Sequence, residues 1–136
     1  MESSTHMVSS SKGRIWAGRI VSALPVLFLL FDGTIHIMRI PAVVEGFAKA
    51  GFPISTAVPL GIIEIVCIIL YVIPRTSVLG AILLMGYLGG AVATNVRQQL
   101  PMLGYVLFPV YVGVFIWGGL WLRDKRVRDL IPLSKG

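Results

Sequence analysis

The sequence predicts an all-α protein, an integral membrane four-helix bundle with a short interfacial helix between the first and second spans. Hydrophobic residues make up 56% of the 136 residues and charged residues only 13%, and the mean hydropathy is +0.86. A soluble domain of this size rarely has such a composition. Apolar segments of about twenty residues, each long enough to cross a bilayer as a helix, follow one another with short connections. We therefore expect the lipid bilayer to be the main partner of the chain.

The predicted spans follow from the apolar runs and from the prolines that end them. They cover roughly Ile15–Met38, Ile54–Ile73, Val78–Gln98 and Met102–Leu122. Pro41 ends the first helix and Pro74 the second, because proline lacks the N–H that a continuing helix needs. In the third span Gly86 and Gly90 form a small-xxx-small pattern. This face predicts close packing within the chain or a homo-oligomer contact through Gly86 and Gly90.

The segment 41–51 predicts a short helix on the outer membrane surface. Glu45 and Lys49 stand at the i,i+4 spacing of an ion pair. Val43 and Phe47 form an apolar side of the same helix. Amphipathic helices of this kind lie in the interface plane, so this one can cover the mouth of the bundle.

The rest of the chain divides into short polar segments. Residues 1–7 (MESSTHM) are interpreted as an expression-tag remnant, which sets His6 aside and leaves His36 as the histidine to explain. Residues 8–14 form the N-terminal segment, residues 15–122 the four-span membrane domain, and residues 123–136 a basic tail. Val127 and Leu130 within this tail predict that it lies on the membrane surface.

The distribution of Lys and Arg predicts the orientation of the bundle. Placing both termini and the turn at Arg75 on one side gathers nine of the 12 basic residues there and leaves Arg39, Lys49 and Arg97 on the other. The positive-inside rule then puts both termini in the cytoplasm of a multi-pass protein of the cell inner (plasma) membrane. The basic residues flank the spans, so we assign the net charge of +6 to topology and lipid contacts, and expect no nucleic-acid partner.

Ionisable residues inside two spans mark the candidate catalytic site. Asp32 and His36 stand four residues apart in the first span, and Glu64 lies midway along the second. Such groups are costly at membrane depth unless they are paired or face a cavity. Side chains at i and i+4 share a helix face, so Asp32 can orient His36 as a general base. Glu64 is expected to donate the proton, because burial disfavours a charged carboxylate.

Depth counting adds four candidate substrate-binding residues: Asn95, Arg97, Tyr105 and Tyr111. At about 1.5 Å of rise per helical residue, they share the outer half of the membrane with the catalytic candidates. Arg97 can neutralise a carboxylate there, and Asn95 or Tyr111 can position a substrate oxygen. We therefore predict a polar pocket for a small lipophilic ligand. The alternative is an internal ion-pair network that only braces the bundle.

The sequence does not predict a resident metal or haem. One histidine in an otherwise carboxylate set is a poor transition-metal site, and no Cys-x-x-Cys-His run is present for haem attachment. The single cysteine, Cys67, excludes an intramolecular disulfide and is interpreted as a small buried hydrophobe. Tyr71, near the inner end of its span, is assigned to the interface. A bound quinone stays open as a cofactor.

Several runs resemble the DoxX-like family of four-helix membrane proteins. They are Gly61-Ile-Ile-Glu64, Leu70-Tyr-Val-Ile-Pro74, the Gly-Tyr-Leu-Gly-Gly-Ala block of residues 86–91, and Trp117-Gly-Gly-Leu-Trp-Leu-Arg123-Asp124. The resemblance implies a four-helix fold and a link to thiosulfate:quinone oxidoreduction, to oxidative-stress complexes or to membrane-protein assembly. Glu64 and Arg97 match the family pattern, whereas Asp32, His36 and Asn95 depart from it.

Two classes of function follow. The first is a membrane-embedded enzyme that uses acid–base chemistry on a small lipophilic substrate, an isomerase or hydrolase acting on an epoxide or a carbonyl. The second is a non-catalytic subunit or assembly partner of a quinone-linked redox complex. A transporter is a third interpretation, which the lack of paired repeats disfavours.

Overall fold

The computed structural model describes the backbone of residues 2–131 and the side chains of residues 11–131. In chain order the elements are α1 (Glu2–Met38), α2 (Pro41–Ala50), the 3-10 turn η1 (Ile54–Thr56), α3 (Ala57–Val72), α4 (Ser77–Arg97), the π-helical turn η2 (Met102–Val106), α5 (Phe108–Arg123) and α6 (Lys125–Leu130). The tag interpretation of residues 1–7 falls outside the described side chains, as do the last five residues of the tail.

Four helical segments are long and apolar enough to cross a membrane: Ser11–Met38, Ile54–Val72, Ser77–Arg97 and Met102–Arg123. Apolar helices of this length satisfy their own backbone hydrogen bonds and can therefore sit in lipid. Residues 2–131 contain no strand. The predicted all-α fold of four membrane helices is confirmed, with span ends close to those expected.

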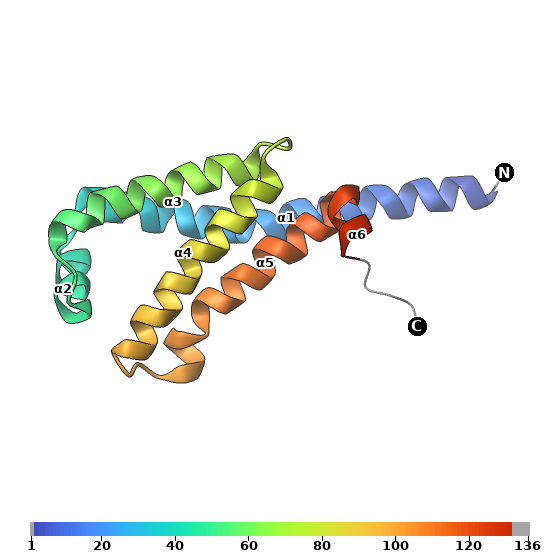
Figure 1. The fold of residues 1–136 in the computed structure, drawn as a ribbon. Coiled ribbons are helices and arrows are strands. Elements are labelled where there is room, and N and C mark those ends of the chain that lie inside the picture. The colour runs from blue at the N-terminus through green and yellow to red at the C-terminus, as the bar shows by residue number, and fades with distance from the viewer. Residues whose placement is uncertain (1, 132–136) are drawn as a thin grey trace.

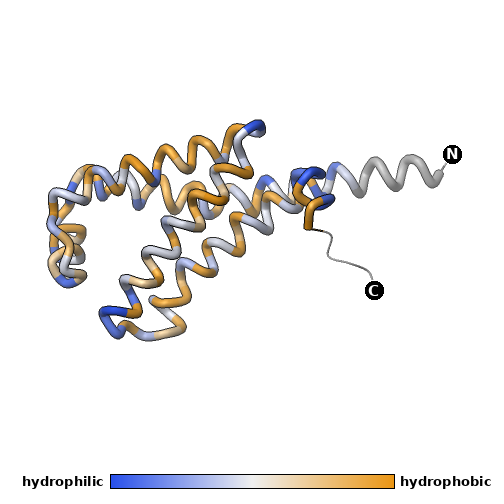
Figure 2. The backbone as a smooth tube through the Cα atoms, viewed as in Figure 1, coloured by the Kyte–Doolittle hydropathy of each residue, from blue (hydrophilic) through white to orange (hydrophobic). Residues whose placement is uncertain are grey.

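The four long helices form a closed ring of neighbours. α1 packs against α3 and α5, and α4 packs against the other sides of α3 and α5. The N-terminal part of α1 and helix α6 lie toward one end of this bundle, here called the terminal end, and α2 lies at the other, the distal end (Figure 1). Toward the distal end the α4–α5 pair diverges from the α1–α3 pair. The helices are mainly hydrophobic, and the most hydrophilic stretches are the connections and α6 (Figure 2).

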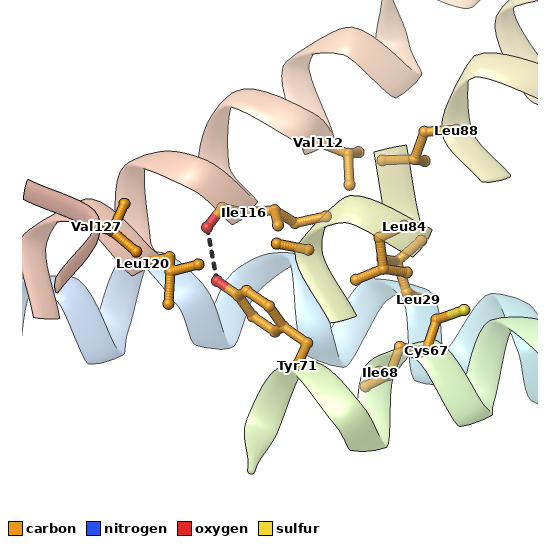
Figure 3. Packing of buried hydrophobic residues seen from close by; sticks show 11 residues of the cluster. Leu29, Cys67, Ile68, Tyr71, Leu84, Leu88, Val112, Ile116, Leu120 and Val127 are labelled. Carbon is orange, nitrogen blue, oxygen red and sulfur yellow. Dashed lines mark hydrogen bonds between the residues drawn. The ribbon is translucent and has the colours of Figure 1, made fainter. Parts of the chain in front are cut away.

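The buried core is centred on Tyr71 of α3 (Figure 3). This side chain is fully buried, and its hydroxyl donates a hydrogen bond of 2.7 Å to the carbonyl oxygen of Ile116. Leu84 of α4 and Leu120 of α5 belong to the same cluster. The assignment of Tyr71 to the interface is therefore wrong, because its polar tip finds a partner inside the bundle.

Helix α2 matches the short helix predicted between the first two spans. The Lys49 ammonium lies 2.6 Å from the Glu45 carboxylate on its exposed side, and Val43 and Ala50 are buried on its inner side. Gly51 ends α2 in the left-handed region, at φ 72°, where glycine meets no Cβ penalty. The chain can thus turn directly into α3.

The Gly86 and Gly90 face of α4 is open. A Cβ atom added at either glycine would meet nothing within 4 Å, so the described residues do not use this face for packing within the chain. That part of the prediction is wrong. A homo-oligomer contact through Gly86 and Gly90 stays a prediction.

Helix α6 turns part of the basic tail back onto the bundle. Asp124 caps it by accepting a hydrogen bond from the backbone N–H of Arg126 at 2.9 Å. Val127 is 2% exposed and joins the core, whereas Leu130 is 77% exposed. The tail is therefore anchored by one buried side chain, and only its outer side faces the surroundings.

Candidate functional site

The structure brings the three catalytic candidates together near the distal end. Asp32, His36 and Glu64 each offer a nitrogen or oxygen atom, and these atoms all lie within 4.8 Å of one another. The Asp32 and His36 side chains are 32% and 17% exposed, and Glu64 is fully buried. The cluster therefore runs from the surface of the bundle to a buried carboxylate.

Two glycines let α1 and α3 approach closely at this point. A Cβ atom on Gly61 would lie 2.6 Å from the carbonyl oxygen of Gly33, and one on Gly33 would lie 3.4 Å from Glu64 Oε2. Because glycine has no side chain, a glycine on each helix lets the two helix backbones approach closely. The pair Gly33–Gly61 thus sets the distance between the Asp32–His36 pair on α1 and Glu64 on α3.

The imidazole of His36 is held by groups that only accept hydrogen bonds. Its Nδ1 lies 2.7 Å from the Asp32 carbonyl oxygen and 3.3 Å from the Asp32 carboxylate oxygen Oδ2. Nδ1 therefore carries a hydrogen, and in the neutral ring Nε2 keeps the free lone pair. This is the tautomer that a general base needs.

Glu64 has one satisfied and one unsatisfied oxygen. Its Oε2 accepts a hydrogen bond of 3.0 Å from the hydroxyl of Tyr87 on α4. Its Oε1 is buried and accepts no hydrogen bond from a donor among the described residues, and the carboxyl group of Asp32 lies beside the Glu64 side chain. A buried polar atom without a partner costs free energy and is a feature of functional sites. Our sequence interpretation missed Tyr87, although a polar-tipped ring within a span could have marked it.

A row of aromatic rings covers His36 from the distal side. The Phe47 ring of α2 lies 5.4 Å from the His36 ring, at an angle of 64°. Phe52 lies 6.2 Å beyond Phe47, and the Arg97 guanidinium lies 5.9 Å from the Phe52 ring. Helix α2 therefore covers the site, and two phenylalanines connect His36 with Arg97. Sequence reasoning gave neither ring this role.

A model of the DoxX-like family matches residues 20–119 of the chain. The chain belongs to the DoxX-like family. The match covers parts of all four spans and includes Asp32, His36, Glu64 and Tyr87. No curated protein and no solved structure matched the chain.

Arg97 of this DoxX-like protein does not neutralise a carboxylate as expected, and its substrate-binding role stays a prediction. Its guanidinium donates a hydrogen bond to the carbonyl oxygen of Ala50, at the C-terminal end of α2. A cation is favourable there because the helix dipole is negative at that end. Among the described residues Arg97 forms no ion pair. It therefore holds α2 in place and does not neutralise Asp32 or Glu64.

The other predicted substrate-binding residues, Asn95, Tyr105 and Tyr111, form hydrogen bonds near the connection between α4 and α5. Asn95 donates a hydrogen bond of 2.9 Å to the carbonyl oxygen of Tyr105, and the Tyr111 hydroxyl donates one of 3.2 Å to the carbonyl oxygen of Leu103. Both bonds brace the connection between α4 and α5. The Tyr105 and Tyr111 side chains are exposed. The structure gives none of these three residues a contact with Asp32, His36 or Glu64, and their substrate-binding role stays a prediction.

Two cavities lie away from the catalytic candidates of the DoxX-like bundle. One of about 480 Å³ opens at the terminal end between α1, α3 and α5. The other, of about 360 Å³, is an apolar groove between α4 and α5 lined by Leu88, Val110 and Trp117 among others. Neither is lined by Asp32, His36 or Glu64. Of the three residues, Asp32 is the most exposed.

The same three residues form a potential cation site. One imidazole nitrogen and two carboxylates within 4.8 Å match the hard, oxygen-rich sets that bind divalent cations better than the thiolate or multi-histidine sets that select zinc. The sequence expectation that no metal binds stays a prediction. Elemental analysis of the purified protein measures it directly.

Proposed function

We propose that this DoxX-like protein binds a small lipophilic molecule next to Asp32, His36 and Glu64 and performs acid–base chemistry on it. The reaction would be of the isomerase or hydrolase type, on a substrate such as an epoxide or a carbonyl compound. His36 would act as the base through Nε2, and Glu64 as the acid. The observation that carries the proposal is the buried Glu64 Oε1, which has no partner among the described residues.

The tautomer of His36 supports the assignment of the base. Its Nδ1 is occupied by the acceptors of Asp32, so Nε2 is the nitrogen that can take a proton from a ligand. The negative Asp32 carboxylate stabilises the imidazolium that forms. The Phe47 ring makes one side of this environment apolar, as a lipophilic substrate requires.

The environment of Glu64 supports the assignment of the acid. The side chain is fully buried, and a carboxyl group that is kept from water is more easily held in its protonated form. With Oε2 bonded to Tyr87, a proton on Oε1 could be donated to a substrate oxygen.

Replacing Glu64 by methionine tests the proposal, because function and stability are expected to change in opposite directions. Glu64→Met removes a desolvated carboxyl with one unsatisfied oxygen and fills its volume with an apolar chain. We expect the free energy of unfolding to rise by about 1–2 kcal/mol. We also expect the proposed lipophilic ligand to co-purify with the wild-type protein and to be lost from the variant. Unfolding by sodium dodecyl sulfate, followed by circular dichroism, measures the first effect. Mass spectrometry of bound small molecules measures the second.

Two further variants complete this experiment: one tests the proposed base, and the other is a control. His36→Ala is expected to abolish turnover of the identified molecule. Thr34→Ala, on the same helix, removes only a hydrogen bond to the Leu30 carbonyl and is expected to change neither result. A loss of stability in Glu64→Met, with an unchanged bound molecule, would instead identify the cluster as a brace.

The alternative function is a non-catalytic subunit or assembly partner of a quinone-linked redox complex. In that role the same residues would bind or brace without turning over a ligand. Two results together would favour this alternative. The wild-type protein would co-purify with a quinone that it does not convert, and His36→Ala would contain the same amount of quinone.

We also propose that the terminal end of the bundle faces the cytoplasm of a plasma-membrane protein. Cys67 is buried, so an introduced exposed cysteine is the accessible thiol. Leu130→Cys on α6 is expected to react with a membrane-impermeant maleimide only after cells are permeabilised. Leu103→Cys at the distal end is expected to react in intact cells, and Cys67 in the wild-type protein to stay unlabelled. The reverse pattern would invert the orientation.

A further inference from the structure

A second polar cluster lies at the terminal end, around the cavity of about 480 Å³. Its polar walls come from three helices and include Arg19 and Ser22 of α1, Tyr71 of α3, and Arg123 of α5. This cavity is at the opposite end of the bundle from the proposed catalytic residues. It is independent of the proposed function.

Arg123 is held in a fixed position at the inner wall of this cavity. Its Nε donates a hydrogen bond of 3.1 Å to Ser22 Oγ, and its Nη2 donates one of 3.3 Å to the Tyr71 carbonyl oxygen. The guanidinium also lies 4.9 Å from the centre of the Tyr71 ring. Because a guanidinium has five N–H donors in one plane, these contacts leave part of the fork available to a ligand.

Close helix packing keeps these groups in place. A Cβ atom on Gly119 of α5 would lie 2.2 Å from Ser22 Oγ, and one on Gly18 of α1 would lie 2.8 Å from the backbone nitrogen of Arg123. Tyr71 uses its single hydroxyl hydrogen toward Ile116 at 2.7 Å, so Ser22, 3.0 Å away, donates to the tyrosine oxygen while accepting from Arg123. These hydrogen bonds therefore hold the Arg123 guanidinium in position before any ligand binds.

The charge of the cavity is positive. Within residues 11–131, neither Arg19 nor Arg123 has a carboxylate within 4 Å. The one acidic residue that lines the cavity, Asp124, is paired with Arg126 at 2.8 Å. The hydrogen bond from Arg126 lowers the pKa of the Asp124 carboxyl, so its charge is already matched. Two cations are left to face the cavity.

Part of the cavity lining is apolar. Ile15, Ala23 and Val26 of α1 and Val72 of α3 form this part. On α1, Ile15 precedes Arg19, and Ala23 and Val26 follow it. At about 1.5 Å per helical residue, Val26 lies about 10 Å beyond Arg19 along the helix. Cationic groups at the mouth and aliphatic groups further in match an amphiphile whose anionic group lies at the interface.

We propose that this cavity binds the phosphate group of an anionic lipid, with Arg19 and Arg123 as its ligands and the Ala23–Val26 wall in contact with an acyl chain. Arginine forks fit phosphate oxygens in pairs. The fixed position of Arg123 distinguishes this site from the diffuse attraction of basic tails to a membrane surface.

Native mass spectrometry of the detergent-purified protein tests the proposal. The protein is titrated with phosphatidylglycerol, with phosphatidylcholine and with inorganic phosphate. We expect phosphatidylglycerol to bind about tenfold more tightly than phosphatidylcholine, and Arg19→Gln to weaken it about tenfold. Arg19 forms no bond that holds the helices together among the described residues, so this variant is expected to fold. Arg14→Gln, which removes an equal charge from α1 outside the cavity, is expected to change the affinity less than about twofold.

Three results would overturn the lipid site. Equal weakening by Arg14→Gln and Arg19→Gln would show a diffuse charge effect. Equal affinities for phosphatidylglycerol and phosphatidylcholine would show that the cavity does not select an anionic lipid. Displacement of phosphatidylglycerol by inorganic phosphate at equal concentration would identify a soluble anion as the occupant. Arg123→Lys gives a supporting measurement. It keeps the positive charge but replaces the planar guanidinium, with its paired N–H donors, by a single ammonium group, so it is expected to weaken phosphatidylglycerol binding.

Discussion

Tyr71→Ala is expected to lower the free energy of unfolding by about 3 kcal/mol or more. The side chain is fully buried between α3, on which it lies, and α1, α4 and α5, and its removal leaves a cavity that the surrounding helices can only partly close. The Ile116 carbonyl and Ser22 also lose the hydroxyl that connects them. Unfolding by sodium dodecyl sulfate, followed by circular dichroism, gives the difference from the wild-type protein.

Two variants separate packing from hydrogen bonding in this result. Tyr71→Phe keeps the ring and is expected to cost about 1–2 kcal/mol, the effect of leaving buried partners unsatisfied. Tyr105→Ala removes an exposed ring and keeps the backbone carbonyl that Asn95 uses, so its effect is expected to be within about 0.5 kcal/mol. A Tyr71→Ala effect as small as that of Tyr105→Ala would contradict the central place of Tyr71 in the core.

Gly61→Ala is expected to separate α1 from α3 and to lower the free energy of unfolding by about 2–3 kcal/mol. The new Cβ atom would lie 2.6 Å from the Gly33 carbonyl oxygen and 3.0 Å from His36 Cβ. Backbone atoms cannot rotate away, so one helix has to move. Because His36 is on α1 and Glu64 on α3, the shift is also expected to weaken binding of the lipophilic ligand that we propose for this site.

Gly86→Ala is the matched control for this variant. It makes the same change in the interior of a spanning helix, but its Cβ atom meets nothing within 4 Å. We expect its stability to be unchanged or slightly higher, since alanine is the better helix former. Equal effects of the two substitutions would show that the Gly33–Gly61 contact does not set the helix spacing.

Much of the fold could be predicted from the sequence, because membrane spans depend on the length and polarity of a run and little on tertiary context. The same holds for α2, where the Glu45 and Lys49 spacing and the following Gly51 are local signals. The burial of Tyr71 could not be predicted. It depends on Gly80, whose added Cβ would lie 2.3 Å from the Tyr71 backbone nitrogen, and on which helices become neighbours.

Part of the candidate site could also be predicted from the sequence, and part could not. Asp32 and His36 share a helix face through a local repeat, and Glu64 lies at nearly the same depth, so depth counting was sufficient for these three. Depth gives the height of a residue along the bundle but not the direction in which its side chain points. Asn95 and Arg97 have a suitable height, yet one braces the α4–α5 connection and the other holds the end of α2.

His36 makes two contacts with Asp32, and they have different effects: the contact with the backbone carbonyl orients the imidazole ring, and the contact with the carboxylate sets the charge beside it. The backbone carbonyl, at 2.7 Å, is present whatever side chain occupies position 32, so it fixes the ring and its tautomer in every variant that keeps the helix. The carboxylate, at 3.3 Å, mainly adds an electric field. Replacing Asp32 by asparagine or serine would therefore change the electric field at the imidazole and leave the orientation of the ring unchanged.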